Sequence, residues 1–344
     1  MADEGTGRAS STGADIRIYA ATYTRPRVKT MSTFPVILGP TAGGKSALAV
    51  ELCLRLNGAG RGPAEVVTAD SMQVFRGMDI GTAKPTAEER RGVVHHLIDV
   101  VEPTEPFSVD QWLKLAEAAI AEVRGRGGVP VVVGGTNLYV KALLEGLFDG
   151  PKADEALRAA LSAMEPSARR AELERVDPEA AKRIHFNDSR RTVRALEVFR
   201  LTGTPISAHQ SQWDGGMRPD AFVVGLEWPV EALNKRINAR VKQMVSDGLV
   251  DEVRGLLEGN RLGRQAREAL GYKQIAEAIE AGGSAGAIDE AVERVKIETR
   301  RFAKNQRTWL KRFRMMEGSR WFEMPGVTAA DMAQHVAGSM FTNE

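Results

Sequence analysis

The residues best suited to chemistry form a short glycine-rich run, which reads Gly39, Pro40, Thr41, Ala42, Gly43, Gly44, Lys45, Ser46. This run matches the pattern G-x-x-x-x-G-K-[ST] and lies between an apolar segment and a helical one. Its glycines let successive backbone N–H groups turn toward phosphate oxygens, and Lys45 adds a mobile ammonium group. Ser46 is the residue type that binds Mg2+ through its hydroxyl in such loops. The run therefore predicts a P-loop of the ATP-binding type, which binds a polyphosphate.

A carboxylate follows the next apolar run along the chain. Asp70 comes directly after Val66–Ala69, a segment that reads as a buried strand. Ligands of open α/β sheets bind at the carboxyl ends of the strands, so Asp70 is expected beside the P-loop. From its position alone, three roles fit equally well: a magnesium ligand, a general base, or a cap for the segment after the strand.

Composition limits the class of protein. The chain has 344 residues, enough for about two domains, and its 43% hydrophobic and 27% charged residues are typical of globular proteins. It has no apolar run of about 18 residues, so we expect no membrane-spanning segment. The formal net charge of +2 does not by itself indicate a nucleic-acid partner. A single cysteine, Cys53, excludes an intrachain disulfide and favours a reducing compartment, by default the cytoplasm.

The P-loop and Asp70 must be positioned by the elements around them. Strands are expected at residues 36–38, 66–69, 129–133 and 222–226, with helices at 47–56, 109–123 and 138–147. This alternation is typical of a parallel sheet. Between residues 150 and 212 the strand pattern is absent, and beyond Trp228 the chain is almost entirely helical. The fold class expected is therefore α/β, a P-loop NTPase-like parallel sheet core with an inserted all-helical domain and a helical C-terminal region.

These patterns also suggest domain boundaries. We expect a disordered extension over 1–32, a core made of 33–140 and 215–325, an inserted helical domain over 141–214, and a C-terminal tail over 326–344. One long helix carries a stripe at helical spacing, which we interpret as a core seam. Its members are Ile288, Val292, Val295, Thr299, Phe302, Gln306, Trp309 and Phe313.

The sequence resembles the tRNA dimethylallyltransferases, also called tRNA isopentenyltransferases. Residues 68–85 read TADSMQVFRGMDIGTAKP and follow the GPTAGGKS loop. Further matches are HHLID at 95–99, GGTNLY at 134–139, ND at 187–188, RTVRALE at 191–197, GYK at 271–273 and QRTWL at 306–310. The resemblance covers about residues 33 to 323. Because cysteine is scarce, the zinc-finger extension of some eukaryotic relatives is excluded and the bacterial type is favoured.

The resemblance implies transfer of a dimethylallyl group from dimethylallyl diphosphate to N6 of adenosine 37, in tRNAs that read UNN codons. The P-loop would then hold the diphosphate leaving group, with Mg2+ at Ser46 as cofactor. By family position, Arg240 joins Lys45 as a cation for the leaving group, and Asp70 is the base that accepts the adenine proton. The expected partners are dimethylallyl diphosphate and the anticodon stem-loop of tRNA, with no membrane and with the enzyme as a monomer.

The resemblance also assigns residues to tRNA binding: Asp70, Ser71, Met72, Gln73, Thr136, Arg158, Arg190, Arg191, Thr192, Val193 and Arg194. The local distribution of charge is consistent with RNA binding. Residues 291–320 hold ten basic and three acidic side chains, and residues 181–200 hold six basic and two acidic ones. The chain departs from the family at Arg190, where Gln is usual, and at Phe186, where Pro is common. The arginine favours a phosphate contact over a base-edge contact. His95 and His96 are interpreted as structural.

Other functions use some of the same features. A P-loop small-molecule kinase would use the same loop and an acid at the same strand end, and it would turn over ATP. An adenylate isopentenyltransferase would act on a free nucleotide, which needs neither a basic insertion nor a long basic C-terminal helix. A non-catalytic RNA-binding protein would not need Lys45, Ser46 and Asp70 together.

Overall fold

The computed structural model of the chain describes residues 18–20, 33–148, 150–209 and 217–341. These residues belong to two compact units. The first unit comprises Met1–Val140 and Pro219–Glu344, and the second, here called the helical unit, comprises Lys141–Arg218. The helical unit ends at Arg218, four residues beyond the boundary expected from the sequence pattern. No helix in the described ranges is both long enough and apolar enough to cross a membrane.

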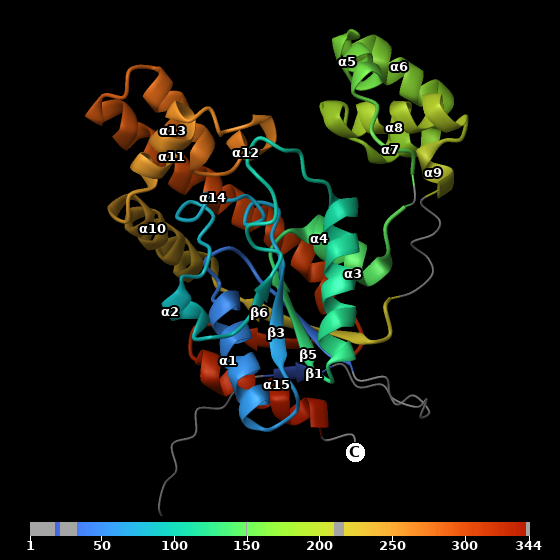
Figure 1. Cartoon of the computed structure of the whole chain (residues 1–344). Coiled ribbons are helices and arrows are strands. Elements are labelled where there is room, and N and C mark those ends of the chain that lie inside the picture. Colours follow the sequence, from blue (N-terminus) through green and yellow to red (C-terminus); the bar gives the residue numbers. More distant parts are fainter. Residues whose placement is uncertain (1–17, 21–32, 149, 210–216, 342–344) are drawn as a thin grey trace, which may run out of the picture. The chain divides into compact units, whose positions relative to one another are not determined.

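A seven-stranded sheet forms the centre of the first unit, with the order β1-β7-β6-β2-β5-β3-β4. The strands are β1 (Ile18–Ala20), β2 (Phe34–Leu38), β3 (Ala64–Ala69), β4 (His95–His96), β5 (Val129–Gly134), β6 (Ala221–Glu227) and β7 (Arg320–Glu323). All neighbours pair in parallel except β1 and β7, so the predicted parallel sheet is confirmed. Because β2 lies between β5 and β6, the P-loop that follows it leaves the middle of the sheet (Figure 1).

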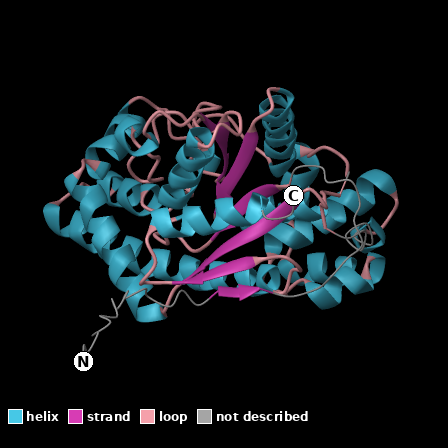
Figure 2. Ribbon diagram, turned by 90° about the horizontal axis from the view of Figure 1, so that it is seen from below, coloured by secondary structure: helices cyan, strands magenta, loops and turns pink. Residues whose placement is uncertain are grey.

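Helices of the first unit follow the strands and lie on both sides of them (Figure 2). Those described are α1 (Lys45–Gly58), α2 (Ala87–Arg90), α3 (Val109–Gly125), α10 (Val230–Ser246), α11 (Leu249–Glu258), α12 (Arg264–Arg267), α13 (Tyr272–Glu280), α14 (Ala285–Arg314) and α15 (Ala329–Phe341). A further helix, α4 (Asn137–Glu145), begins in the first unit and ends in the helical unit. Leu48, Leu52 and Leu56 recur every four residues in α1 and are fully buried. They pack against Ile37 of β2 in the main core cluster.

Both ends of the chain differ from the sequence expectation. Residues 326–344 are not simply a tail, because α15 buries Met332, Ala333 and Val336 in the same core cluster as α1. The spacing of these residues puts them on one face of a helix, a pattern that is present in the sequence itself. Within the expected disordered extension, Ile18–Ala20 pairs antiparallel with β7, and the rest of 1–32 lies outside the described residues.

The helical unit contains only helices among its described elements, as expected for the insertion. They are α5 (Glu155–Ala163), α6 (Pro166–Val176), α7 (Pro178–Arg183), α8 (Ser189–Thr202) and α9 (Ile206–His209). Aspartates 154, 177 and 188 cap the starts of α5, α7 and α8 through backbone N–H groups, which fixes where these helices begin. The unit has a core of its own, with Leu161, Leu173 and Leu196 fully buried in it.

Candidate active site

A cavity of about 340 Å3 lies in the first unit, at the carboxyl ends of β2, β3 and β5. Its lining comes from the P-loop, the loop after β3, His95 of β4, the end of β5, helices α10 and α14, and the segment 268–271 between α12 and α13. Lys45, Ser46, Asp70, Thr136 and Arg240 all line it. The structure thus brings together residues that the sequence analysis assigned to the leaving group, the metal and the base.

The P-loop is held in place by side chains from outside it. Helix α1 begins at Lys45, and the residue before it, Gly44, has a left-handed φ of 91° that favours glycine. Trp228 Nε1 donates to Gly43 O at 3.0 Å, and Arg236 Nε donates to Ala42 O at 2.8 Å. These contacts fix the loop carbonyls with protein donors, so the loop is shaped before a ligand binds.

Two cationic residues, Lys45 and Arg240, and two acidic residues, Asp70 and Glu268, line the cavity. Burial lowers the pKa of Lys45 to about 8, with the charge of Arg240 acting in the same direction and that of Asp70 against it. Burial likewise lowers the pKa of Arg240, while Asp70 opposes the shift. Lys45 Nζ also donates to Pro40 O at 2.8 Å. Glu268 forms an ion pair with Lys273 at 2.8 Å, whereas the charge of Asp70 acts on both Lys45 and Arg240. With Asp70 shared between these two buried cations, the site favours an additional anion.

Asp70 fills one of the three roles that its position allowed, that of a cap. Its Oδ1 accepts the backbone N–H groups of Met72 at 2.9 Å and Gln73 at 3.3 Å, so the carboxylate caps the turn after β3. Its Oδ2 has no hydrogen-bond partner among the described residues. The cap fixes the orientation of the carboxylate, and the second oxygen remains as a proton or metal acceptor in the cavity.

Thr136 connects the end of β5 to this turn. Its Oγ1 accepts from Ser71 N at 3.0 Å and lies 3.3 Å from Ser71 Oγ, while its N–H donates to Ala69 O at 3.3 Å. The side chain of Gln73 is buried and donates to the carbonyls of Thr82 and Ala83, which fixes its orientation, and Gln73 also lines the cavity. Met72 lines the cavity.

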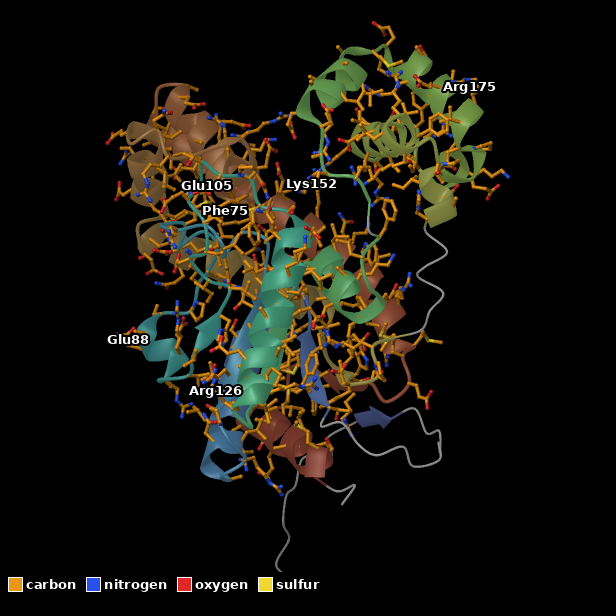
Figure 3. The ribbon with its side chains drawn as sticks, turned by 45° about the vertical axis from the view of Figure 1, so that its right-hand side comes forward. Phe75, Glu88, Glu105, Arg126, Lys152 and Arg175 are labelled. Carbon is orange, nitrogen blue, oxygen red and sulfur yellow. The ribbon has the colours of Figure 1, made fainter. Side chains whose placement is uncertain are left out.

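The loop after β3 is anchored by a buried lysine. Lys84 Nζ donates to Phe75 O at 2.6 Å, to Asp79 Oδ1 at 2.7 Å and to Asp99 Oδ1 at 2.5 Å. Phe75, labelled in Figure 3, is itself fully buried. His96 Nε2 lies 2.6 Å from Glu65 Oε2, and His95 Nδ1 contacts Val93 O, although His95 also lines the cavity. These contacts give both histidines structural partners.

The sequence pattern indicates that the stripe on α14 is core, but part of this stripe lines the cavity. Val295, Thr299, Phe302 and Gln306 line the cavity, and Phe302 remains 42% exposed. The sequence carries a sign of this lining role, because Thr299 and Gln306 are polar residues on an otherwise apolar stripe. A site explains polar residues at these positions better than a core seam does.

In the helical unit, two of the expected RNA-binding arginines are held by one acid. Glu197 is fully buried, and its carboxylate accepts from Arg158 Nε at 2.9 Å and Arg194 Nη1 at 2.6 Å. Burial opposes ionisation of Glu197, but hydrogen bonds from Arg194, from the N–H of Asp154 and from Arg158 outweigh it and lower the pKa of Glu197. Both guanidinium groups therefore have set orientations.

The run 190–194 divides into exposed and buried positions. Arg190 and Arg191 are exposed on α8. Val193 packs in the core of the helical unit, and Thr192 is buried with its Oγ1 donating to Asp188 O at 2.9 Å. The expectation that the side chains of Thr192 and Val193 contact tRNA is not supported, because α8 turns them inward.

A sequence model described as IPP transferase matches residues 73–313. The chain belongs to this family. A tRNA dimethylallyltransferase of Geobacillus kaustophilus is 42% identical over 315 residues, which make up 89% of this chain and 96% of that protein. The resemblance stated from the sequence is therefore confirmed.

Solved structures of IPP transferase family members resemble this fold. The full-length tRNA isopentenylpyrophosphate transferase of Bacillus halodurans gives a TM-score of 0.64 at 39% identity, covering 90% of this chain and 97% of that one. A eukaryotic dimethylallyltransferase acting on tRNA gives a TM-score of 0.72 at 27% identity, covering 88% of this chain and 75% of that one. The P-loop core expected from the sequence is thus the fold of this family.

Proposed function

We propose that the chain is a tRNA dimethylallyltransferase, which transfers a dimethylallyl group from dimethylallyl diphosphate to N6 of adenosine 37 in tRNAs reading UNN codons. The single observation that carries this proposal is the cavity, where an anion site with Lys45 and Arg240 lies with an oriented carboxylate, Asp70. Membership of the IPP transferase family and the names of the relatives support the same reaction.

The cationic side of the cavity suits a leaving diphosphate. As the bond between the allylic carbon and the phosphate oxygen breaks, negative charge grows on the diphosphate. Loop N–H groups, Lys45 and Arg240 are preorganised to stabilise that charge, which acts more strongly in a partly enclosed cavity than in water. The cavity walls around it include Ile237, Val241 and Phe302, which suit the apolar allyl group.

The nucleophile belongs on the side of Asp70. The N6 nitrogen of adenine attacks the allylic carbon, the new C–N bond replaces the C–O bond to diphosphate, and the N6 proton passes to the carboxylate of Asp70. The amine is a weak nucleophile, because its lone pair is delocalised into the ring. A positioned base therefore contributes about 100- to 10,000-fold to the rate.

We also propose Mg2+ as cofactor. No three His, Cys, Asp or Glu side chains are grouped for a metal in the described ranges. Mg2+ does not need such a group, because it commonly combines one or two protein oxygens with substrate phosphates and water. The hydroxyl of Ser46 lines the cavity and is the donor we assign, and the ion would neutralise charge on the diphosphate.

The RNA partner we propose is the anticodon stem-loop. An unpaired loop adenine can leave the base stack and enter a pocket, while basic side chains bind the backbone. Arg190 and Arg191 on α8 are the exposed residues assigned to that contact. We propose that the enzyme acts as a monomer in the cytoplasm, a reducing compartment that suits the single, buried Cys53.

The test is incubation of the protein with labelled dimethylallyl diphosphate and an anticodon stem-loop carrying A or G at position 37. We expect label only in the A-containing RNA, with release of diphosphate and no consumption of ATP. Label on free adenylate instead would support the adenylate isopentenyltransferase, and ATP turnover would support the kinase. Label in both RNAs, or in neither, would refute the proposal.

A further inference from the structure

We propose that Gln306 is a positioning residue, which holds the P-loop against the end of β5 and thereby aligns the leaving group with the attacking base. The inference rests on the proposed function. Gln306 lies on α14 and is 3% exposed. Its Oε1 accepts from Thr41 N at 2.8 Å, and its Nε2 donates to Gly135 O at 2.9 Å. One side-chain amide thus joins two loops that follow different strands.

The two loops carry the two halves of the reaction. Thr41 belongs to the P-loop, four residues before Lys45. Gly135 precedes Thr136, whose Oγ1 accepts from Ser71 N in the turn that holds Asp70. The path from the P-loop that carries Lys45 to the base Asp70 therefore runs through Gln306, then Gly135 and Thr136, and then Ser71.

Close packing confines the amide. A Cβ atom on residue 135 would lie 2.6 Å from Gln306 Nε2 and 3.5 Å from Lys45 Nζ. Glycine at position 135 thus leaves the space that the Gln306 amide occupies, and a larger residue there would displace the amide. Because both amide atoms have backbone partners and the side chain is buried, Gln306 has little freedom to adopt another conformation.

The chemistry of the contact requires glutamine. It needs an acceptor for Thr41 N–H and a donor for Gly135 O on the same side chain. Methionine has a similar length and volume but supplies neither group. Gln306 contacts backbone groups rather than reacting atoms, so its contribution is to alignment, where a displacement of about 1 Å lowers the rate about 100-fold.

The experiment compares kcat and both KM values for Gln306→Met and a matched control, Gln265→Met. Gln265 also bridges backbone groups, since its Oε1 accepts from Phe107 N at 2.9 Å and its Nε2 donates to Phe107 O at 2.8 Å, but it does not line the cavity. We expect Gln306→Met to lower kcat about 10- to 100-fold with each KM within about threefold of wild type. Gln265→Met should keep the wild-type kcat.

A second variant, Gly135→Ala, places a methyl group against Gln306 Nε2. It displaces the Gln306 amide while leaving residue 306 itself unchanged. We expect it to lower kcat similarly, and the double variant Gln306→Met with Gly135→Ala to be little worse than either single variant. A wild-type kcat for Gln306→Met, an equal loss in Gln265→Met, or fully multiplicative effects in the double variant would overturn the inference. A wild-type enzyme that transfers no label would instead refute the proposed function.

Discussion

The hydroxyl of Tyr272 donates a hydrogen bond of 2.5 Å to Glu252 Oε1, and the same carboxylate accepts the backbone N–H groups of Asp79, Ile80 and Gly81. A Cβ atom on residue 81 would lie 2.4 Å from Tyr272 Cε2, so the ring packs directly on the loop. Burial, followed by the charge of Glu252, raises the pKa of Tyr272 and keeps its proton in place. This contact ties the loop after β3 to α11 and α13.

Tyr272→Phe removes the donor and keeps the ring. Because the lost hydrogen bond reaches a carboxylate, we expect the free energy of unfolding to fall by about 1.5–3 kcal/mol, measured by urea denaturation. Glu280→Gln is the comparison, since that acid is exposed and pairs with Arg267 at the surface. Similar stabilities for the two variants would show that the Tyr272 contact contributes nothing beyond a surface ion pair.

Binding of inorganic diphosphate should weaken as the pH rises through about 8, because Lys45 loses its proton in that range. In Lys45→Arg the cation persists, so the affinity of the variant relative to the wild type should rise between about pH 7 and about pH 9.5, a comparison in which the ionisation of diphosphate itself cancels. Isothermal titration calorimetry measures both. A relative affinity that does not change over this interval would contradict a diphosphate contact by Lys45.

The same pKa has a consequence for stability. Lys45 has a pKa of about 8 in the folded chain against an ordinary value of 10.5, so between these values the unfolded chain binds more protons. Its contribution to the free energy of unfolding therefore rises with pH across that window.

Asp70→Asn keeps an oxygen to accept the N–H of Met72 but removes the basic carboxylate. We expect single-turnover label transfer to slow about 100- to 10,000-fold while the free energy of unfolding stays within about 0.5 kcal/mol. The control is Asp110→Asn, which changes an exposed residue on α3 and should leave the rate of label transfer unchanged. Near-normal transfer by Asp70→Asn would remove Asp70 from the role of base.

Gly134→Ala tests how closely β5 approaches β3. A Cβ atom at this position would lie 2.1 Å from Ala69 O, so the strands must separate and we expect a loss of about 1–3 kcal/mol in the free energy of unfolding. Gly286→Ala on α14 has open space around it, and helix propensity predicts a gain of about 0.5–1 kcal/mol. Chemical denaturation that ranks the two variants the other way would contradict this packing.

Arg190→Ala and Arg191→Ala should weaken binding of the anticodon stem-loop. The salt dependence of binding is the slope of log K against log salt concentration. If each side chain contacts one phosphate, each change reduces the magnitude of this slope by about 1. Arg175→Ala, an exposed arginine on α6 of the same unit that is labelled in Figure 3, serves as the control. Equal losses for all three variants, measured by filter binding, would indicate nonspecific charge effects instead.

Much of the site was predictable because its parts are contiguous in sequence. The P-loop is built from neighbouring residues, and its position after a strand is a matter of local pattern. Asp70 was likewise expected beside it, because parallel strands end at one edge of the sheet. The assignment of Arg240 needed the family resemblance, since an isolated arginine on a helix is usually a solvated residue.

The sequence by itself determined the parallel sheet, the P-loop and the family, because these depend on short-range pattern and on contiguous motifs. Only the tertiary structure decided which side chains meet across the cavity. Gln306 and Thr41 are far apart in the chain, and their contact depends on where α14 packs. The same holds for α8, where burial separates Val193 from its exposed neighbours. Such contacts arise from packing between distant elements, which local periodicity does not encode.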